Sequence, residues 1–271
     1  MLNTETKLFA ILGYPVKHSF SPQLHNEWFE KEMLNCAYLS FEPDSRNLKK
    51  TIESLKVLKF HGFNITVPYK IEAMKYVDFT DKAAKEIGSI NTVAVKNDKL
   101  CGYNTDHLGF IQDLNAKKIN LNNKNVLVVG AGGAARAIAY ALKNARATKD
   151  IYIANRTLAS AQNLAKTFKV KSIDTNKVSE LLSQIDLLIN CSSCGMKKED
   201  SFPFVIDKIK KSLIVYDLIY NKVTPFVKFA KAKGLKVFTG EGMLVRQGAS
   251  AFEIWTGKYP KITDNLLKKF I

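Results

Sequence analysis

The sequence predicts an α/β protein with two domains, each built on a mainly parallel sheet. Three observations support this prediction. The chain has 271 residues, and at roughly 100–200 residues per domain this corresponds to two domains or one large α/β unit. Segments typical of strands alternate with segments typical of helices along the whole chain. Residues 126–129 form a short, wholly apolar run, as in strands that a parallel sheet buries on both faces.

The first third of the chain alternates between strands and helices and then forms a hairpin. Ser21 begins the first helix, because Pro22 suits the first helical position. Asn97 and Asp98 are turn formers between two segments rich in β-branched and apolar residues, which predicts the hairpin. We expect strands at 7–12, 37–41, 61–65, 90–96 and 100–103, helices at 21–33 and 44–57, and a further helix from Thr105.

A second α/β series begins at Asn125, and its pattern is doubly wound. We expect strands at 126–129, 151–154, 169–173, 186–190, 213–217 and 236–238, with a helix at 132–143 and tail helices at 242–255 and 262–270. The aromatic residues of the tail, Phe252, Trp255 and Phe270, need a surface to bury against, so we expect the tail to pack on the first domain. The predicted domains are therefore residues 1–106 completed by 241–271, and residues 107–240.

The positive charge of the chain is concentrated in its middle segment. The whole chain carries a net charge of +16, and residues 107–240 hold 22 basic and 9 acidic side chains. Such a segment attracts an anionic partner such as a nucleotide or a nucleic acid. Most of these lysines stand singly rather than in the cluster typical of a nucleic-acid site. We therefore expect no nucleic-acid partner, and a lysine-rich surface without a function is the alternative interpretation.

Composition and residue spacing argue against four further classes of protein: secreted, membrane-spanning, disulfide-stabilised and metal-binding proteins. The unbroken apolar run at 8–12 is too short for a signal-peptide core, and no run approaches the ~20 residues of a membrane span. We therefore expect a soluble, cytoplasmic protein with no membrane partner. Four cysteines are too few for a disulfide framework. Cys191 and Cys194 form a C-x-x-C pair without a second ligand pair at zinc spacing, and His18 and His25 match no metal spacing, so we expect no metal.

A glycine-rich turn joins the apolar strand at 126–129 to the helix that follows. It matches G-x-G-x-x-A at Gly130, Gly132 and Ala135. The first glycine permits the tight turn, the second lets the backbone approach a pyrophosphate, and the small alanine lets helix and strand pack closely. The amino terminus of the helix then presents free N–H groups to phosphate oxygens. This context predicts a Rossmann-like dinucleotide-binding domain, although any tight turn between strand and helix can use glycines.

The end of the next strand indicates which dinucleotide is bound. Sites that prefer NAD usually carry Asp or Glu about 20 residues beyond the loop. Here Asn155, Arg156 and Thr157 follow the strand, without a carboxylate. The planar guanidinium of Arg156 suits a 2′-phosphate, which predicts NADP (NADPH) as the cofactor. An ordinary surface arginine is the alternative.

The remaining polar residues form motifs that resemble one known family. The motifs are GYPVKHSFSPQLHN at 13–26, GFNITVPYK at 62–70, Asn91-Thr92, GYNTDHLG at 102–109, the glycine loop, Asn155-Arg156-Thr157, DLIYN at 217–221 and GMLVRQG at 242–248. In this order they resemble the shikimate dehydrogenase family over almost the whole chain. The resemblance implies reversible, NADPH-dependent reduction of 3-dehydroshikimate to shikimate, in the pathway to chorismate and the aromatic amino acids.

The resemblance also implies roles for individual residues. Lys70 and Asp106 would be the catalytic pair. The substrate would be bound by Ser19 and Ser21 at its carboxylate, by Thr66, Asn91, Asp106 and Gln247 at its hydroxyls, and by Tyr220 near the carboxylate end. The cofactor would be bound by Gly130, Ala131, Gly132, Gly133, Ala134, Asn155, Arg156, Thr157 and Gly240. It further implies a cleft between two domains that close around both ligands.

The chemistry of these residues agrees with those roles. Hydride addition to a ketone places negative charge on its oxygen, and a lysine can stabilise that charge and supply the proton. Asp106 would hold Lys70 and accept a hydrogen bond from a substrate hydroxyl, whereas a surface salt bridge is the alternative. Ser19 and Ser21 lie two residues apart on a segment we expect to be extended, which places both hydroxyls on one side. Ser21 could also cap the helix.

Some positions depart from the family pattern, and other functions stay open. Residues 191–196 replace the usual Ala-Thr-Ser sequence, Lys222 stands where proline is common, and Ser160 replaces a second basic residue expected at the 2′-phosphate. Relatives that accept quinate or use NAD are the nearest alternatives, and a non-catalytic NADP or nucleic-acid binder is a more distant one. The sequence does not fix the oligomeric state, and a homodimer is compatible with it.

Overall fold

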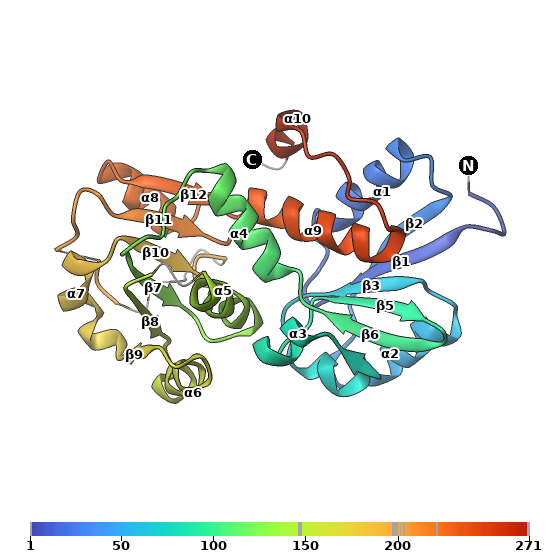
Figure 1. Cartoon of the computed structure of the whole chain (residues 1–271), viewed down its shortest axis with the longest axis horizontal. Coiled ribbons are helices and arrows are strands. Elements are labelled where there is room, and N and C mark those ends of the chain that lie inside the picture. The colour runs from blue at the N-terminus through green and yellow to red at the C-terminus, as the bar shows by residue number, and fades with distance from the viewer. Residues whose placement is uncertain are drawn as a thin grey trace. The chain divides into compact units, whose positions relative to one another are not determined.

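A computed structural model describes residues 2–145, 148–196, 200, 202, 204–206, 208–220 and 222–269 (Figure 1). The chain forms two compact units. Unit 1 consists of Met1–Gly109 and Leu244–Leu266, and unit 2 of Phe110–Met243 and Leu267–Ile271. Each unit contains one six-stranded sheet in which parallel pairs predominate, which confirms the predicted α/β class.

The sheet of unit 1 has three strands in parallel and a hairpin beside them. Its order is β2-β1-β3-β5-β6-β4. Strand β5 is antiparallel to both neighbours, whereas the other pairs are parallel. The hairpin prediction is confirmed, because Asn97 and Asp98 take the positive φ angles of 50° and 58° between β5 and β6. The strands are β1 (Lys7–Leu12), β2 (Cys36–Phe41), β3 (Gly62–Ile65), β4 (Phe79–Thr80), β5 (Thr92–Lys96) and β6 (Lys99–Tyr103).

Helices pack on both faces of this sheet. On one face, helix α2 (Leu48–Val57) buries Leu48, Ile52 and Leu55 against alternate strand residues. Helices α1 (Ser21–Lys31) and α9 (Glu241–Thr256) lie on the other face (Figure 1). Their aromatic side chains contact Phe9 of strand β1 and one another. The prediction that the tail packs on the first domain is confirmed for Phe252 and Trp255, and Phe270 lies outside the described residues.

His25 lies at the centre of this aromatic face and is fully buried. Its ring stacks on Tyr38 at 4.5 Å between centroids and also contacts Trp28 and Trp255. Both ring nitrogens lack a hydrogen-bond partner within the described part of the chain. Burial disfavours the charged imidazolium and lowers the pKa of His25 to about 3. The folded protein therefore keeps His25 neutral.

We predict that His25 makes unit 1 sensitive to acid. Above pH 6.5 His25 is neutral in the folded and the unfolded chain. As the pH falls from 6.5 towards 3, only the unfolded chain binds the proton, so the folded state loses about 1.4 kcal/mol per pH unit. Between about pH 7 and pH 5 we expect the wild type to lose about 2 kcal/mol more unfolding free energy than His25→Phe.

Urea unfolding followed by tryptophan fluorescence measures this difference. The chain has 2 tryptophans, and both contact His25, so their signal reports unit 1. The larger phenylalanine ring can shift the unfolding free energy of His25→Phe by an amount that does not depend on pH. This shift does not affect the test, because only the change of unfolding free energy with pH is compared between the two proteins. Parallel pH dependences in the two proteins would contradict the account of His25.

The sheet of unit 2 is wholly parallel and doubly wound, as predicted. Its order is β12-β11-β10-β7-β8-β9. Strands β8 and β9 follow β7 on one side of it, whereas β10, β11 and β12 follow on the other side. The order of the strands therefore reverses between β7 and β10. The strands are β7 (Asn125–Val129), β8 (Asp150–Ala154), β9 (Lys171–Ile173), β10 (Leu187–Asn190), β11 (Ile214–Asp217) and β12 (Lys236–Thr239).

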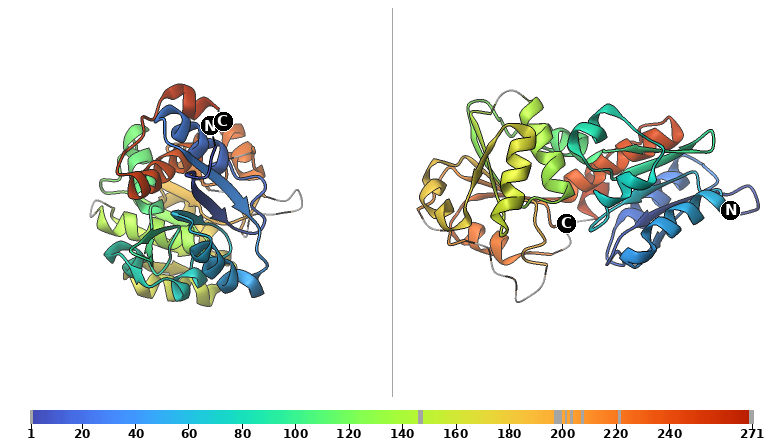
Figure 2. Two further views of the ribbon diagram at one scale, coloured as in Figure 1. Left: turned by 90° about the vertical axis from the view of Figure 1, so that its right-hand side faces the viewer. Right: turned by 90° about the horizontal axis from the view of Figure 1, so that it is seen from below.

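Alternate residues of β7 enter two different cores. Val126 and Val128 pack with residues of helices α4, α5 and α6, whereas Leu127 and Val129 pack with residues of α7 and α8. These helices lie on the two faces of the sheet of unit 2 (Figure 2). This burial on both faces explains the unbroken apolar run in the sequence. The helices are α4 (Asp106–Ala116), α5 (Gly133–Asn144), α6 (Leu158–Phe168), α7 (Val178–Leu181) and α8 (Pro225–Ala232).

Three local features differ from the sequence predictions. The segment with Ser19 and Ser21 is not extended, because Phe20 is helical (φ −81°, ψ −4°) and Ser21 is the first residue of α1. Ser21 also does not cap that helix. The helix expected at 44–57 begins with a 3₁₀ turn, Ser45–Asn47, whose cap is Asp44. Strand β4 and helix α3 (Lys82–Ile87) were not expected, because both are very short.

Among the described residues, no helix combines the length and the hydropathy that a membrane span requires.

Candidate functional site

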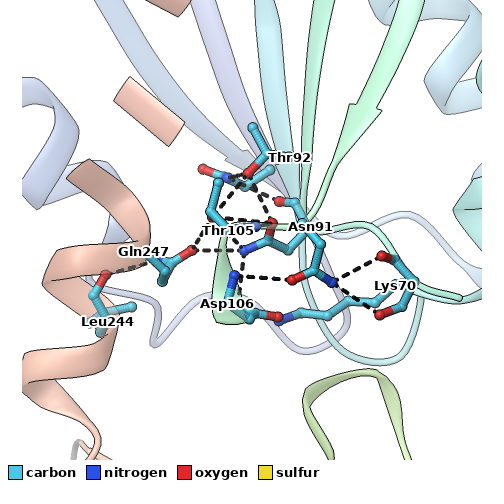
Figure 3. Close-up of polar contacts among 10 residues, drawn as sticks. Lys70, Asn91, Thr92, Thr105, Asp106, Leu244 and Gln247 are labelled. Carbon is cyan, nitrogen blue, oxygen red and sulfur yellow. Dashed lines mark hydrogen bonds and ion pairs between the residues drawn. The ribbon is translucent and has the colours of Figure 1, made fainter. Parts of the chain in front are cut away.

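A buried cluster of polar side chains lies in unit 1, where β3, β5, the start of α4 and helix α9 meet (Figure 3). The cluster combines one lysine, one aspartate, amides and hydroxyls in direct contact. Its members are Asn64, Lys70, Asn91, Thr92, Asn104, Thr105, Asp106 and Gln247. A polar cluster of this size within a protein core is unusual, because every group has to be hydrogen-bonded.

Lys70 and Asp106 form an ion pair inside the cluster. Lys70 Nζ lies 2.6 Å from Asp106 Oδ2, and their side chains are 13% and 5% exposed. Asp106 is the first residue of α4, and its backbone N–H donates to Asn104 Oδ1 at 3.1 Å. The low exposure separates this pair from the solvated salt bridge that the sequence alone could not exclude.

Asn91 connects the other members of the cluster to Asp106. Its Nδ2 lies 2.9 Å from Asp106 Oδ1, Thr105 Oγ1 and Gln247 Oε1. Its Oδ1 accepts from the Thr105 backbone N–H at 2.7 Å and from Thr92 Oγ1 at 3.0 Å. The structure thus brings together four residues that the sequence predicted as functional: Lys70, Asn91, Asp106 and Gln247.

Three predicted residues of unit 1 lie outside these contacts. Ser19 is half-buried, and its Oγ accepts from the backbone N–H of Ser21 at 3.2 Å. Ser21 is buried at the start of α1. Thr66 is half-buried directly after β3, and its backbone N–H donates to Leu12 O. Tyr220 belongs to unit 2, in the segment after β11.

Residue-level reasoning missed Asn64, Thr92 and Tyr38. Asn64 and Thr92 are fully enclosed polar residues on strands, at 5% and 0% exposure. The available signal was an asparagine or threonine inside an otherwise apolar strand, as in residues 62–65 and 92–95, because a core tolerates such a residue only with partners. Tyr38, whose hydroxyl donates to Asn64 Oδ1 at 2.6 Å, gave no such signal, since tyrosine is ordinary in a strand.

The glycine loop of unit 2 follows β7 and leads into α5. Gly130 has φ +119°, and a Cβ there would lie 3.1 Å from the Cys191 backbone, so only glycine suits the turn. Gly132 is the N-cap residue of α5, with φ −81° and ψ −171°, and its backbone conformation suits any residue. A Cβ at Gly132 would meet no protein atom within 4 Å. Neither strain nor packing therefore explains the glycine at position 132.

The open space at Gly132 fits a ligand that approaches the backbone closely. The first N–H groups of α5 have no partner within their own helix and can bind an anion there. The loop also stands at the carboxyl end of β7, beside the reversal of strand order, where doubly wound sheets bind ligands. The residues present thus fit the pyrophosphate of a dinucleotide.

The other residues predicted at this site follow further strands of the same sheet. Asn155, Arg156 and Thr157 follow β8, with the side chains of Arg156 and Thr157 exposed, and Asn155 Nδ2 donates to Thr157 O at 3.1 Å. Gly240 follows β12, where a Cβ would lie 2.1 Å from Leu218 O. Close packing is therefore sufficient to explain this glycine.

A buried carboxylate shapes the loops after β10 and β11. Asp217 accepts from Asn190 Nδ2, Thr224 Oγ1 and the Ile219 backbone N–H at 2.7–3.1 Å. Burial raises the pKa of Asp217, and these hydrogen bonds oppose the rise. Among the described residues, no three His, Cys, Asp or Glu side chains form a group that could hold a metal ion.

Family models match three parts of the chain. Residues 11–93 match the shikimate dehydrogenase substrate binding domain. Residues 113–201 match the shikimate / quinate 5-dehydrogenase model, and residues 240–263 match the shikimate 5′-dehydrogenase C-terminal domain. The first two models correspond to units 1 and 2 in turn.

Relatives match over almost their full length. The shikimate dehydrogenase (NADP(+)) of Aquifex aeolicus is 42% identical over 257 residues, which is 95% of this chain and 94% of that protein. The crystal structure of shikimate dehydrogenase from Aquifex aeolicus has a TM-score of 0.91 and covers 99% of this chain and 98% of its own, at 39% identity. The Thermus thermophilus enzyme in complex with NADP(H) and shikimate has a TM-score of 0.88, at 34% identity, and covers 98% of this chain and 100% of its own.

Proposed function

Because this chain belongs to the shikimate dehydrogenase family, we propose that it catalyses the reversible NADPH-dependent reduction of 3-dehydroshikimate to shikimate. The observation that carries the proposal is the buried Lys70–Asp106 pair within the amide and hydroxyl cluster of unit 1. A protein that only binds the cofactor has no need of an enclosed ion pair next to groups that suit a polyhydroxylated substrate.

Lys70 supplies the positive charge and the proton that the reaction needs. When bound, NADPH supplies the hydride that reduces the ketone carbon. The Lys70 ammonium donates a hydrogen bond to the ketone oxygen, stabilises the charge that develops there and transfers a proton to it. In the reverse direction the neutral amine of Lys70 takes the hydroxyl proton.

Asp106 and its neighbours hold Lys70 and the substrate in place. Oδ2 of Asp106 accepts from Lys70, and Oδ1 accepts from Asn91, so the carboxylate cannot rotate freely. We propose that its remaining lone pairs accept from a substrate hydroxyl, with Asn91, Gln247 and Thr66 binding the other hydroxyls. Ser19 and Ser21 are proposed to bind the carboxylate, with Tyr220 near that end.

Unit 2 is proposed to bind the cofactor. The loop from Gly130 through Ala131, Gly132, Gly133 and Ala134 would hold the pyrophosphate at the start of α5. Arg156, with Asn155 and Thr157, would bind the 2′-phosphate after β8. Gly240 is proposed to line the nicotinamide end. The fit of Gly132 to a closely approaching ligand supports this assignment.

Product analysis tests the proposed function. Purified protein is incubated with NADPH and 3-dehydroshikimate, and the product is compared with authentic shikimate by chromatography while the reduced-nicotinamide absorbance is followed. We expect loss of absorbance and formation of shikimate in equal amounts. Absence of shikimate, with protein that is folded and binds NADPH, would refute the proposal.

We predict that Gly132→Ala weakens cofactor binding without destabilising the fold. An added methyl group meets no protein atom and the backbone conformation suits alanine, whose smaller chain entropy offsets its weaker preference for the N-cap position, so the melting temperature should change little. The same methyl group would occupy the space of the pyrophosphate, and we expect the KM for NADPH to rise about 10-fold or more. Gly130→Ala is the matched contrast, because φ +119° there predicts loss of stability. A wild-type KM in Gly132→Ala would contradict the assignment.

Two further expectations stay predictions. The similarity to known proteins tests neither the expected homodimer nor the expected cytoplasmic location. Size-exclusion chromatography with light scattering measures the first, and fractionation of the source cell measures the second.

A further inference from the structure

Gly13 and Thr66 lie opposite each other, directly after strands β1 and β3. These strands pair in parallel up to their last residues, and two backbone hydrogen bonds continue the pairing beyond them. The N–H of Thr66 donates to Leu12 O at 2.8 Å, and the N–H of Tyr14 donates to Val67 O at 3.0 Å. The backbones of Gly13 and Thr66 are therefore held side by side.

Gly13 leaves space for the methyl group of Thr66. A Cβ atom at position 13 would lie 2.3 Å from Thr66 Cγ2 and 3.1 Å from Val67 O. Gly13 is buried, and it is not among the glycines with a positive φ angle, so its backbone conformation also suits alanine. Close contact with the Thr66 methyl group therefore explains the glycine at this position.

The space beside Gly13 also sets the direction of the Thr66 hydroxyl. The hydroxyl and the methyl group are bonded to the same Cβ atom, and they turn together about χ1 among a few staggered positions. When the methyl group lies against Gly13, the chirality of Cβ leaves the hydroxyl a single direction. The backbone cannot easily compensate for a turn, because the Thr66 carbonyl also accepts from the Tyr69 N–H at 2.9 Å. The side chain is only half-buried, so a ligand can reach it.

We propose that Gly13 is a positioning residue, which holds the Thr66 hydroxyl in its binding direction by accommodating the Thr66 methyl group. The inference rests on the proposed function, in which Thr66 binds a hydroxyl of the substrate. A side chain at position 13 displaces the methyl group, and the hydroxyl then turns away with it. The two glycines Gly13 and Gly132 thus act differently, since Gly13 makes room for a protein group and Gly132 for a ligand.

Two backgrounds at position 66 separate positioning from packing. With threonine present, Gly13→Ala forces the side chain to turn, and we expect kcat/KM for shikimate to fall about 10-fold. Thr66→Val keeps a methyl group against Gly13 but has no hydroxyl, so in this background Gly13→Ala should cost less than about twofold further. The melting temperature should fall equally in both backgrounds, because the steric conflict is the same. The KM for NADP should stay within about twofold throughout.

Thr66→Ser provides a background in which the effect changes sign. Serine keeps the hydroxyl and lacks the methyl group, so its hydroxyl can turn into the space beside Gly13, and we expect kcat/KM to fall about threefold. Gly13→Ala fills that space and excludes this rotamer. We therefore expect Gly13→Ala to raise kcat/KM in the Thr66→Ser background and to leave the melting temperature almost unchanged. These two variants carry the test if Gly13→Ala alone does not fold.

Three results would overturn the proposal. The first is a wild-type kcat/KM in Gly13→Ala. The second is an equal loss of kcat/KM with threonine and with valine at position 66, which would mean that Gly13 acts through stability or through the loop after it. The third is a further loss on Gly13→Ala in the Thr66→Ser background.

Wild-type oxidation of shikimate in the same assay tests the proposed function separately. No turnover by the wild type would refute both the proposed function and the role of Gly13. Turnover by the wild type, together with any of the three contrary results, would refute the role of Gly13 alone.

Discussion

Lys70→Ala should lower kcat for shikimate oxidation about 10²–10⁴-fold, the usual range for loss of a general acid–base group. The substrate keeps its proposed contacts with the serines, Asn91 and Gln247, so its Kd should change far less. Steady-state kinetics measures the first quantity and titration calorimetry with shikimate the second. Unchanged turnover would remove Lys70 from the mechanism.

The chain offers a matched control for the loss of an enclosed ion pair. Lys117 and Asp113 form a second pair in unit 2, with side chains 22% and 2% exposed. Lys117→Ala therefore also leaves an aspartate without its lysine, and we expect a similar loss of stability with kcat within about threefold of wild type. An equal loss of turnover in both variants would mean that broken ion pairs act through stability alone.

Arg156→Gln should reduce the preference for NADPH over NADH about 10- to 100-fold, since hydrogen bonds to charged groups contribute about 1.5–3 kcal/mol. The change should act on kcat/KM for NADPH and leave that for NADH almost unaltered, because only NADPH carries the 2′-phosphate. The side chain is exposed, so the melting temperature should not change. Ser160 stands where the family pattern has a second basic residue. The preference for NADPH over NADH should therefore depend more strongly on Arg156 alone.

Lys166→Gln controls for net charge. Lys166 is exposed in the last turn of α6, and its substitution removes the same charge from the same unit. We expect its cofactor preference to equal that of wild type. A matching loss of NADPH preference in Lys166→Gln would indicate that the general positive field of unit 2, rather than a contact from Arg156, selects the phosphate.

Local constraints explain which parts of the structure could be predicted from the sequence. Strands β7, β10 and β11 of unit 2 are mainly apolar runs, and the turn at Gly130 needs a positive φ angle, so each follows from a few adjacent residues. The same holds for the hairpin at Asn97 and Asp98. The extended segment expected at Ser19 and Ser21 was wrong for an equally local reason, since Pro22 lies in the first turn of α1 and the helix starts one residue earlier than a capping serine would allow.

The hydrogen-bond network of unit 1 could not be predicted from the sequence in the same way. Lys70 and Asp106 are 36 residues apart, and Asn91 and Gln247 are 156 apart. These contacts exist only because β3, β5, α4 and α9 converge, and no local pattern encodes that convergence. The resemblance to a family pointed to those four residues, but it did not reveal that Tyr38 and Asn64 extend their hydrogen-bond network into strands β2 and β3.

We propose above that this chain transfers hydride between shikimate and NADP. The most direct test follows the reduced-nicotinamide absorbance with purified protein and shikimate, in parallel cells with NADP and NAD, and with quinate in place of shikimate. We expect fast reduction of NADP by shikimate and much slower reduction in the other cells. Equal rates with quinate or NAD would contradict the stated specificity, and no reduction in any cell would contradict the claim itself.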